Sequence, residues 1–151
     1  MTSVNVQFSV AVHILAVLAS RKGEGVTSAT LAASVNADAT FVRRTVSKLS
    51  KADIVVATRG KKGACVLSRA PEEISLLDVY RASDAPLTFA IHGYPVAPTC
   101  PISVNIKDVL SKVLEHTQNA FEASLVSRTL ADVMNDLKGR GALPELYCCE
   151  K

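Results

Sequence analysis

A segment that is apolar on both of its helical faces places the strongest constraint on how this chain folds. Read as a helix, residues 7–20 carry Phe8 and Leu15 on one face, and Ile14 and Val17 on the other. A helix that is apolar on both sides has to be buried on both sides. We therefore expect this segment to be a core helix, with part of its cover supplied by a second subunit.

The same segment is too polar to cross a membrane. Polar side chains interrupt residues 4–20, so the chain contains no run of about 18 consecutive apolar residues. No Lys or Arg precedes the segment, and residues 21–25 are typical of a turn rather than of a signal-peptide cleavage site. We expect a cytoplasmic protein with no membrane partner. In that compartment its four cysteines are expected to be free thiols: Cys65, Cys100, Cys148 and Cys149.

The charged residues are distributed unevenly along the chain. Residues 21–69 contain ten Lys or Arg against three Asp or Glu, a net charge of +7. Residues 70–151 contain seven basic and eleven acidic side chains, a net charge of −4. A basic half of this kind is typical of a domain that binds a polyanion, whereas the acidic half serves another purpose.

Capping residues predict two short helices in the basic half. Thr27 or Ser28 is suited to cap a helix over residues 29–35, and Asp38 is suited to cap a second helix over residues 39–51. The apolar side chains of the second helix recur at i, i+4 and i+7 and are expected to face inward: Val42, Val46 and Leu49. The opposite face of this helix is then left to solvent.

A β-hairpin is predicted directly after these helices. Residues 54–58 are β-branched, residues 64–67 form the returning strand, and the glycine-bounded turn at 59–63 is cationic. Two helices joined by a turn and followed by a hairpin are the order of a winged helix-turn-helix, whose second helix enters the major groove of DNA. The predicted fold class is therefore mainly α with a small β-hairpin.

The acidic half predicts two capped helices on either side of a long one. A capping box at residues 75–78 starts a helix that ends near Ala82, and a second box at residues 129–132 starts one that ends near Leu137. Between them, residues 84–101 form a proline-rich irregular loop. From Asn105, apolar residues sketch the stripe of a long amphipathic helix: Ile106, Val109, Leu110, Val113, Leu114, Ala120, Phe121 and Leu125.

The stripe of the long helix also lacks cover in one small domain, so we expect a homodimer. We divide the chain into four parts: a winged helix-turn-helix domain (1–83), a loop that carries the sensor (84–102), a dimerisation helix with a short terminal helix (103–138) and a tail (139–151).

The exposed face of the second helix and the hairpin supply the candidate DNA contacts. Arg43 and Arg44 can donate to guanine O6 and N7, which is worth roughly 1–3 kcal/mol of discrimination for a bidentate pair. The other cations are expected to neutralise phosphates, which orients the protein without choosing a sequence. The full predicted set is Thr27, Ser28, Asp38, Thr40, Arg43, Arg44, Ser47, Lys48, Lys51, Arg59, Lys61 and Lys62.

Several of these stretches resemble the Rrf2 (Rrf-two) family of winged-helix regulators, which includes IscR, NsrR and CymR, and within it the YwnA-like branch. The resemblance rests on residues 32–36, 42–44, 49–54, 59–64 and 74–82, and continues at 100–101, 105–106 and 129–132. It implies a repressor that binds a palindromic operator as a homodimer joined by the long helix, with residues 38–51 as recognition helix and 59–63 as wing. Iron–sulfur members carry three closely spaced cysteines in the loop before the long helix. Here that loop has only Cys100, so we expect no cofactor.

Cys100 is the candidate signal-receiving residue. It precedes the long helix, whose N-terminal dipole would favour the thiolate and its reaction with an oxidant or electrophile. The alternative is that Cys100 packs the loop against the helix. Cys65 is expected to be a small buried hydrophobe, and Cys148 and Cys149 to undergo adventitious oxidation.

Two other classes of function remain open. A winged helix can be a protein-interaction module that never binds DNA, and the protein can be an iron–sulfur or metal-sensing regulator. His13, His92 and His116 match no dense ligand motif, so we expect no metal site. No catalytic constellation or phosphate-binding loop is visible, and we do not expect an enzyme.

Overall fold

Helix α1 (Gln7–Ser20) lies at the centre of the structure, a computed structural model that describes residues 6–58 and 63–142. Its bounds are those predicted, and Ala11, Ile14 and Leu15 are fully buried. Four shorter helices pack around it: α2 (Ser28–Val35), α3 (Ala39–Lys51), α4 (Leu76–Ala82) and α6 (Leu130–Gly139). Burial on both sides of α1 is confirmed, and helices of the same chain supply this cover. Val10, Val12 and Val17 are half-buried in the single chain, so the expected cover from a second subunit stays a prediction.

A three-stranded antiparallel sheet lies beside these helices. Its strands are β1 (Val26–Thr27), β2 (Val55–Ala57) and β3 (Ala64–Leu67), in the order β1-β3-β2. The predicted hairpin is β2 and β3, in which Val56 pairs with Val66. The sequence did not predict β1, which pairs Val26 with Cys65 and so makes β3 the central strand. Gly25 permits this approach, because a Cβ there would lie 2.8 Å from Thr58 Cγ2.

Two capping boxes of the acidic half lie next to each other. Ser75 caps α4 and Thr129 caps α6, each with the Asp three residues later, as the sequence predicts. A short antiparallel bridge pairs Ser75 with Thr129. Leu76 N donates to Arg128 O at 2.8 Å, and Leu130 N donates to Ile74 O at 2.8 Å. These bonds, beside the short 3-10 helix η1 (Pro71–Glu73), return the chain to the body after the long helix.

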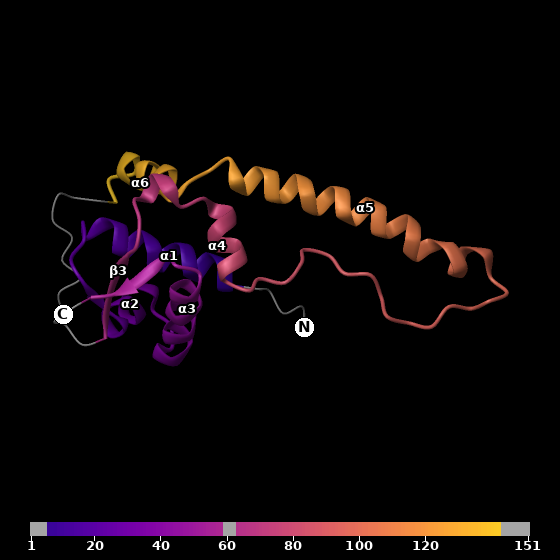
Figure 1. Ribbon diagram of the computed structural model, residues 1–151, viewed down its shortest axis with the longest axis horizontal. Coiled ribbons are helices and arrows are strands. Elements are labelled where there is room, and N and C mark those ends of the chain that lie inside the picture. The colour runs from indigo at the N-terminus through magenta and orange to yellow at the C-terminus, as the bar shows by residue number, and fades with distance from the viewer. Residues whose placement is uncertain (1–5, 59–62, 143–151) are drawn as a thin grey trace.

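The loop after α4 runs outward from the body, and the long helix α5 (Pro101–Val126) runs back beside it, so that the two form an arm (Figure 1). The helix begins at Pro101 rather than at Asn105, with Cys100 as its N-cap residue. Proline suits the first helical position, where its missing N–H has no partner to lose. Lys107 Nζ donates to Tyr94 O at 2.6 Å, which holds the loop on the helix. Among the described residues, no helix is long and apolar enough to span a membrane.

The apolar stripe of α5 is divided between two faces. Leu110, Leu114 and Phe121 are half-buried on the face toward the loop and the body. Val109 and Val113 are 56% and 53% exposed on another face. No described side chain of α5 is fully buried. The arm therefore leaves an apolar face without cover in one chain.

Candidate nucleic-acid interface

A tight turn joins α2 and α3, and it is stabilised by Asn36 at the end of α2 and by Asp38 at the start of α3. Asn36 ends α2 in the left-handed conformation with φ 57°, a region that asparagine tolerates. Asp38 Oδ1 accepts hydrogen bonds from Thr40 N at 2.9 Å and Phe41 N at 3.0 Å, and so caps α3. The predicted helix-turn-helix is confirmed at residue level. The same contacts give Asp38 a structural role within the candidate DNA-binding set.

The inner face of α3 fixes which side chains point outward. Val42 and Leu49 are fully buried, and Val46 is half-buried, as predicted. Thr45 is also buried, with its hydroxyl donating to Phe41 O at 3.1 Å. The exposed side then carries most of the predicted contacts on this helix: Thr40, Arg43, Arg44, Ser47 and Lys51.

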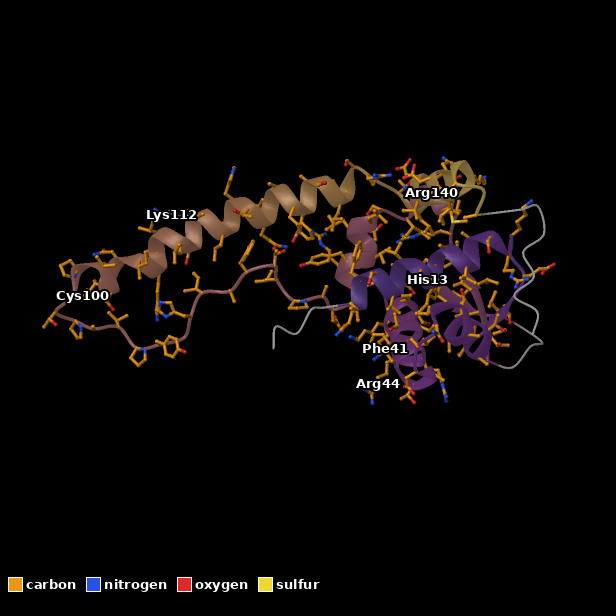
Figure 2. The ribbon with its side chains drawn as sticks, turned by 180° about the vertical axis from the view of Figure 1, so that it is seen from behind. His13, Phe41, Arg44, Cys100, Lys112 and Arg140 are labelled. Atoms are coloured by element: carbon orange, nitrogen blue, oxygen red, sulfur yellow. The ribbon has the colours of Figure 1, made fainter. Side chains whose placement is uncertain are left out.

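The two arginines leave α3 in different directions, because consecutive helical residues are about 100° apart. Arg43 Nε donates to Ala39 O at 3.3 Å. Its side chain lines a shallow depression of about 260 Å³ with Thr27, Ser28 and Gly63. Arg44 points away from the body (Figure 2). Arg43 thus faces the start of α2 and the wing, whereas Arg44 faces outward.

The wing is described at its base only. Thr58 N donates to Ala64 O at 2.9 Å, which closes the hairpin above β2 and β3. Gly63 has φ 74°, the left-handed conformation that a tight turn requires of glycine. The predicted wing contacts Arg59, Lys61 and Lys62 lie outside the described residues, as do Cys148 and Cys149.

Lys48 differs from the other cations of α3. It is half-buried, and its Nζ donates to Gln7 Oε1 at 2.9 Å and to Ser83 O at 3.4 Å. Asp84 Oδ2 lies 3.4 Å from the same nitrogen. The spacing of residues along α3 gave no sign of these partners, because all three come from other elements.

The two described cysteines occupy contrasting positions. Cys65 is 6% exposed in β3, and burial raises the pKa of its thiol, in line with the predicted hydrophobic role. Cys100 is half-exposed at the end of α5 farthest from the body (Figure 2). A helix of 26 residues is about 39 Å long. Cys100 therefore lies far from the recognition helix of its own chain.

A tight turn between two helices, an exposed cationic face on the second and an adjoining hairpin define a winged helix-turn-helix domain. The model of the Rrf2 family, described as an iron-dependent transcriptional regulator, matches residues 4–136. The chain therefore belongs to the Rrf2 family of transcriptional regulators, which confirms the resemblance seen in the sequence.

Similar proteins match the arm as well as the body. YwnA of Bacillus subtilis (strain 168), a candidate HTH-type transcriptional regulator, is 41% identical over 135 residues, which are 89% of this chain and 98% of YwnA. A crystal structure of a candidate DNA-binding protein is 39% identical with a TM-score of 0.69, and covers 85% of this chain and 99% of its own. A candidate transcriptional regulator from Lactobacillus plantarum is 30% identical with a TM-score of 0.77, covering 91% and 93%.

The family description raises the question of whether this chain can hold iron. The loop before α5 supplies one thiol, that of Cys100, and the other described thiol is buried in the sheet. Within residues 6–58 and 63–142, no three His, Cys, Asp or Glu side chains are grouped to hold a metal ion. His13 Nε2 instead lies 3.1 Å from Ser34 Oγ, and His92 lies against Tyr94. Because an iron–sulfur cluster needs several cysteine-type ligands, the described residues of one chain do not fit one.

Proposed function

We propose that this protein is a homodimeric transcriptional repressor that reads a palindromic DNA operator through α3. The observation that carries the proposal is the exposed face of α3, where Arg43 lies beside the base of the wing and Arg44 points outward. Side chains in this position reach base edges when the second helix of the pair enters the major groove. Family membership supports the same function.

The residues around the arginines divide into base readers and phosphate contacts. Arg44 reads a guanine, since it points away from the body into the space that DNA would fill. Arg43 reads toward the wing side of the groove. Phosphates are bound by side chains at the edges of the surface, which orient the protein: Thr27, Ser28, Thr40, Ser47, Lys51 and the wing cations Arg59, Lys61 and Lys62.

The dimer forms through α5. Val109 and Val113 lie four residues apart on one helical face, and both are more than half exposed in the single chain. Ile102 is 72% exposed one heptad before Val109, so it continues the same face. A second copy of α5 covers this row, and the two-fold axis places two α3 helices on the two half-sites of an operator.

The regulator works without an iron–sulfur cluster and senses through Cys100. The thiolate of Cys100 adds to an electrophile, or it attacks a peroxide, forming an S–O bond and breaking the O–O bond to give a sulfenic acid while the other oxygen leaves as water or an alcohol. Because Cys100 lies at the tip of the arm, its modification reaches the DNA-binding body through α5 or through the partner subunit. The test measures operator binding by wild type and Cys100→Ser after treatment with oxidant. If oxidised wild type still binds the operator as Cys100→Ser does, Cys100 is not the sensor.

Footprinting of genomic fragments tests the proposal, beginning with the promoter of the protein's own gene. We expect a protected palindrome whose half-sites lie about one helical turn, or a multiple of it, apart. Binding to the same fragments is measured at several salt concentrations, because the logarithm of the affinity of a DNA-binding surface falls linearly with the logarithm of the salt concentration. Absence of protection together with a flat salt response would favour a protein-interaction module instead.

A further inference from the structure

We propose that Lys48 is a positioning residue that ties the recognition helix to the loop before α5, and that it does not bind a DNA phosphate. This inference rests on the proposed function of α3. It changes the role that the sequence suggests for Lys48, and it connects the loop that ends at Cys100 with the helix that reads DNA.

The ammonium group of Lys48 already has partners within the protein. A lysine ammonium has three N–H groups and no acceptor. Three oxygens surround Lys48 Nζ: Gln7 Oε1 at 2.9 Å, Ser83 O at 3.4 Å and Asp84 Oδ2 at 3.4 Å. The first two accept hydrogen bonds, and the carboxylate of Asp84 pairs with the ammonium charge, so a phosphate approaching Lys48 meets a negative charge already beside it.

The three partners of Lys48 come from different elements of the fold. Gln7 is the first residue of α1, Ser83 follows the last residue of α4, and Asp84 is the first residue of the loop. Ser83 is 1% exposed, so its backbone position is fixed by the core. Lys48 therefore joins α3 to two helices of the body and to the start of the loop.

Lys51 provides the contrast on the same helix. It lies three residues later and is exposed. Within residues 6–58 and 63–142, its ammonium makes no side-chain hydrogen bond or ion pair. A cation of this kind is available to a phosphate, whereas Lys48 is already held by the protein.

The consequence is a physical link between loop and recognition helix. Asp84 has φ 51°, a conformation that aspartate and asparagine tolerate, and its carboxylate faces Lys48. A displacement of the loop that withdraws Asp84 removes the ion pair that links the loop to the C-terminal half of α3. Operator recognition then weakens even though no DNA contact has changed.

The test compares four variants on operator and on random duplex DNA at several salt concentrations. Lys48→Met and Asp84→Asn alter the link, Lys51→Met removes an exposed cation, and Asp53→Asn removes an exposed acid at a second left-handed position. We expect Lys51→Met to weaken both duplexes alike and to lower the salt slope by about 0.9. We expect Lys48→Met and Asp84→Asn each to weaken operator binding alone by about 5- to 10-fold, with the salt slope unchanged.

The sign of the Asp84→Asn effect separates the two roles of Lys48. If Lys48 binds a phosphate, removal of Asp84 frees it, and affinity for both duplexes rises beyond the rise caused by Asp53→Asn. That result, or a loss of about 0.9 in the salt slope of Lys48→Met, would overturn the proposal. The Lys48→Met/Asp84→Asn double variant should be no weaker than Lys48→Met alone, since Lys48→Met already removes the interaction with Asp84.

Thermal unfolding keeps this inference separate from the proposed function. If wild type fails to bind any DNA, the proposed function fails, but the cycle of Lys48 and Asp84 variants still reports on the link. We expect Lys48→Met to lower Tm by about 2–5 °C more than Lys51→Met, as loss of charge-assisted hydrogen bonds predicts. Equal Tm values for these two variants, with additive effects of Lys48 and Asp84, would show that the link contributes nothing.

Discussion

Arg81 Nη2 lies 2.8 Å from Glu122 Oε2, and this ion pair joins α4 of the body to the last third of α5. The Tyr80 and Phe121 rings meet edge to face beside it, with centroids 5.2 Å apart. The Tyr80 ring also lies edge to face against the Phe8 ring of α1, with the two centroids 6.1 Å apart. The arm is thus attached to the core helix through α4, and its attachment includes a titratable group.

This attachment should depend on acid pH. A hydrogen bond from Gln118, and then one from Arg81, lower the pKa of Glu122. A carboxyl group with a lowered pKa stabilises the fold above its unfolded pKa of about 4.3 and loses that contribution as the pH falls through the folded value. We therefore expect wild type to be more stable than Glu122→Gln at pH 7, and the difference to shrink below about pH 4. Urea unfolding of both proteins across this range measures it, and a difference that grows with acidity would contradict the assignment.

The described thiols should differ sharply in reactivity. The Cys65 thiol is buried and its pKa is raised, while Cys100 is half-exposed. In a Cys148→Ser/Cys149→Ser background, we expect one thiol to react at once with a disulfide reagent and a second only after unfolding. Addition of Cys100→Ser should abolish the fast phase. A fast phase that survives this change would show that Cys65 is accessible.

Charge on the exposed face of α5 should separate the subunits. Val113→Glu places a carboxylate in the row that a second copy is proposed to bury, and an unpaired buried charge costs several kcal/mol or more. Light scattering should give twice 16.0 kDa for wild type and 16.0 kDa for Val113→Glu. Lys112→Glu is the control, since Lys112 is exposed next to it and projects from the arm in Figure 2. A monomeric wild type at micromolar concentration would contradict the dimer.

Asp38 should stabilise the protein mainly as the cap of α3, and its negative charge should contribute less. Its carboxylate caps α3, and replacing a capping residue by alanine costs about 1 kcal/mol. We expect Asp38→Ala to lower Tm by about 2–4 °C and Asp38→Ser, which retains a capping oxygen, to unfold near wild type. If Asp38→Ser is as unstable as Asp38→Ala, capping of α3 does not account for the contribution of Asp38 to stability.

Features that local chemistry determines could be predicted from the sequence. Residues 7–20 and 39–51 form the helices that their apolar spacing indicated, and both capping boxes occur where Ser75 and Thr129 predicted them. The helix α5 begins at Pro101, four residues before the predicted Asn105, because proline suits the first turn of a helix as well as a loop.

Features that depend on distant parts of the chain could not be predicted. Strand β1 has two residues and exists only because β3 lies beside it. The spacing of the apolar stripe of α5 predicts one surface, yet Leu114 lines a depression between the helix and the neighbouring loop, whereas Val113 is exposed. Lys48 has the spacing of an exposed residue, and its partners Gln7 and Ser83 are 41 and 35 residues away.

The sequence specificity of Arg44→Ala shows whether α3 reads the operator through its arginines. The measurement is the ratio of affinities for operator and random duplex at one fixed salt concentration, for wild type, Arg44→Ala and Lys51→Ala. We expect Arg44→Ala to lower this ratio by about 5- to 150-fold, the range for loss of a bidentate guanine contact, whereas Lys51→Ala weakens both duplexes and leaves the ratio unchanged. An Arg44→Ala protein that keeps the wild-type ratio would show that Arg44 does not read the operator.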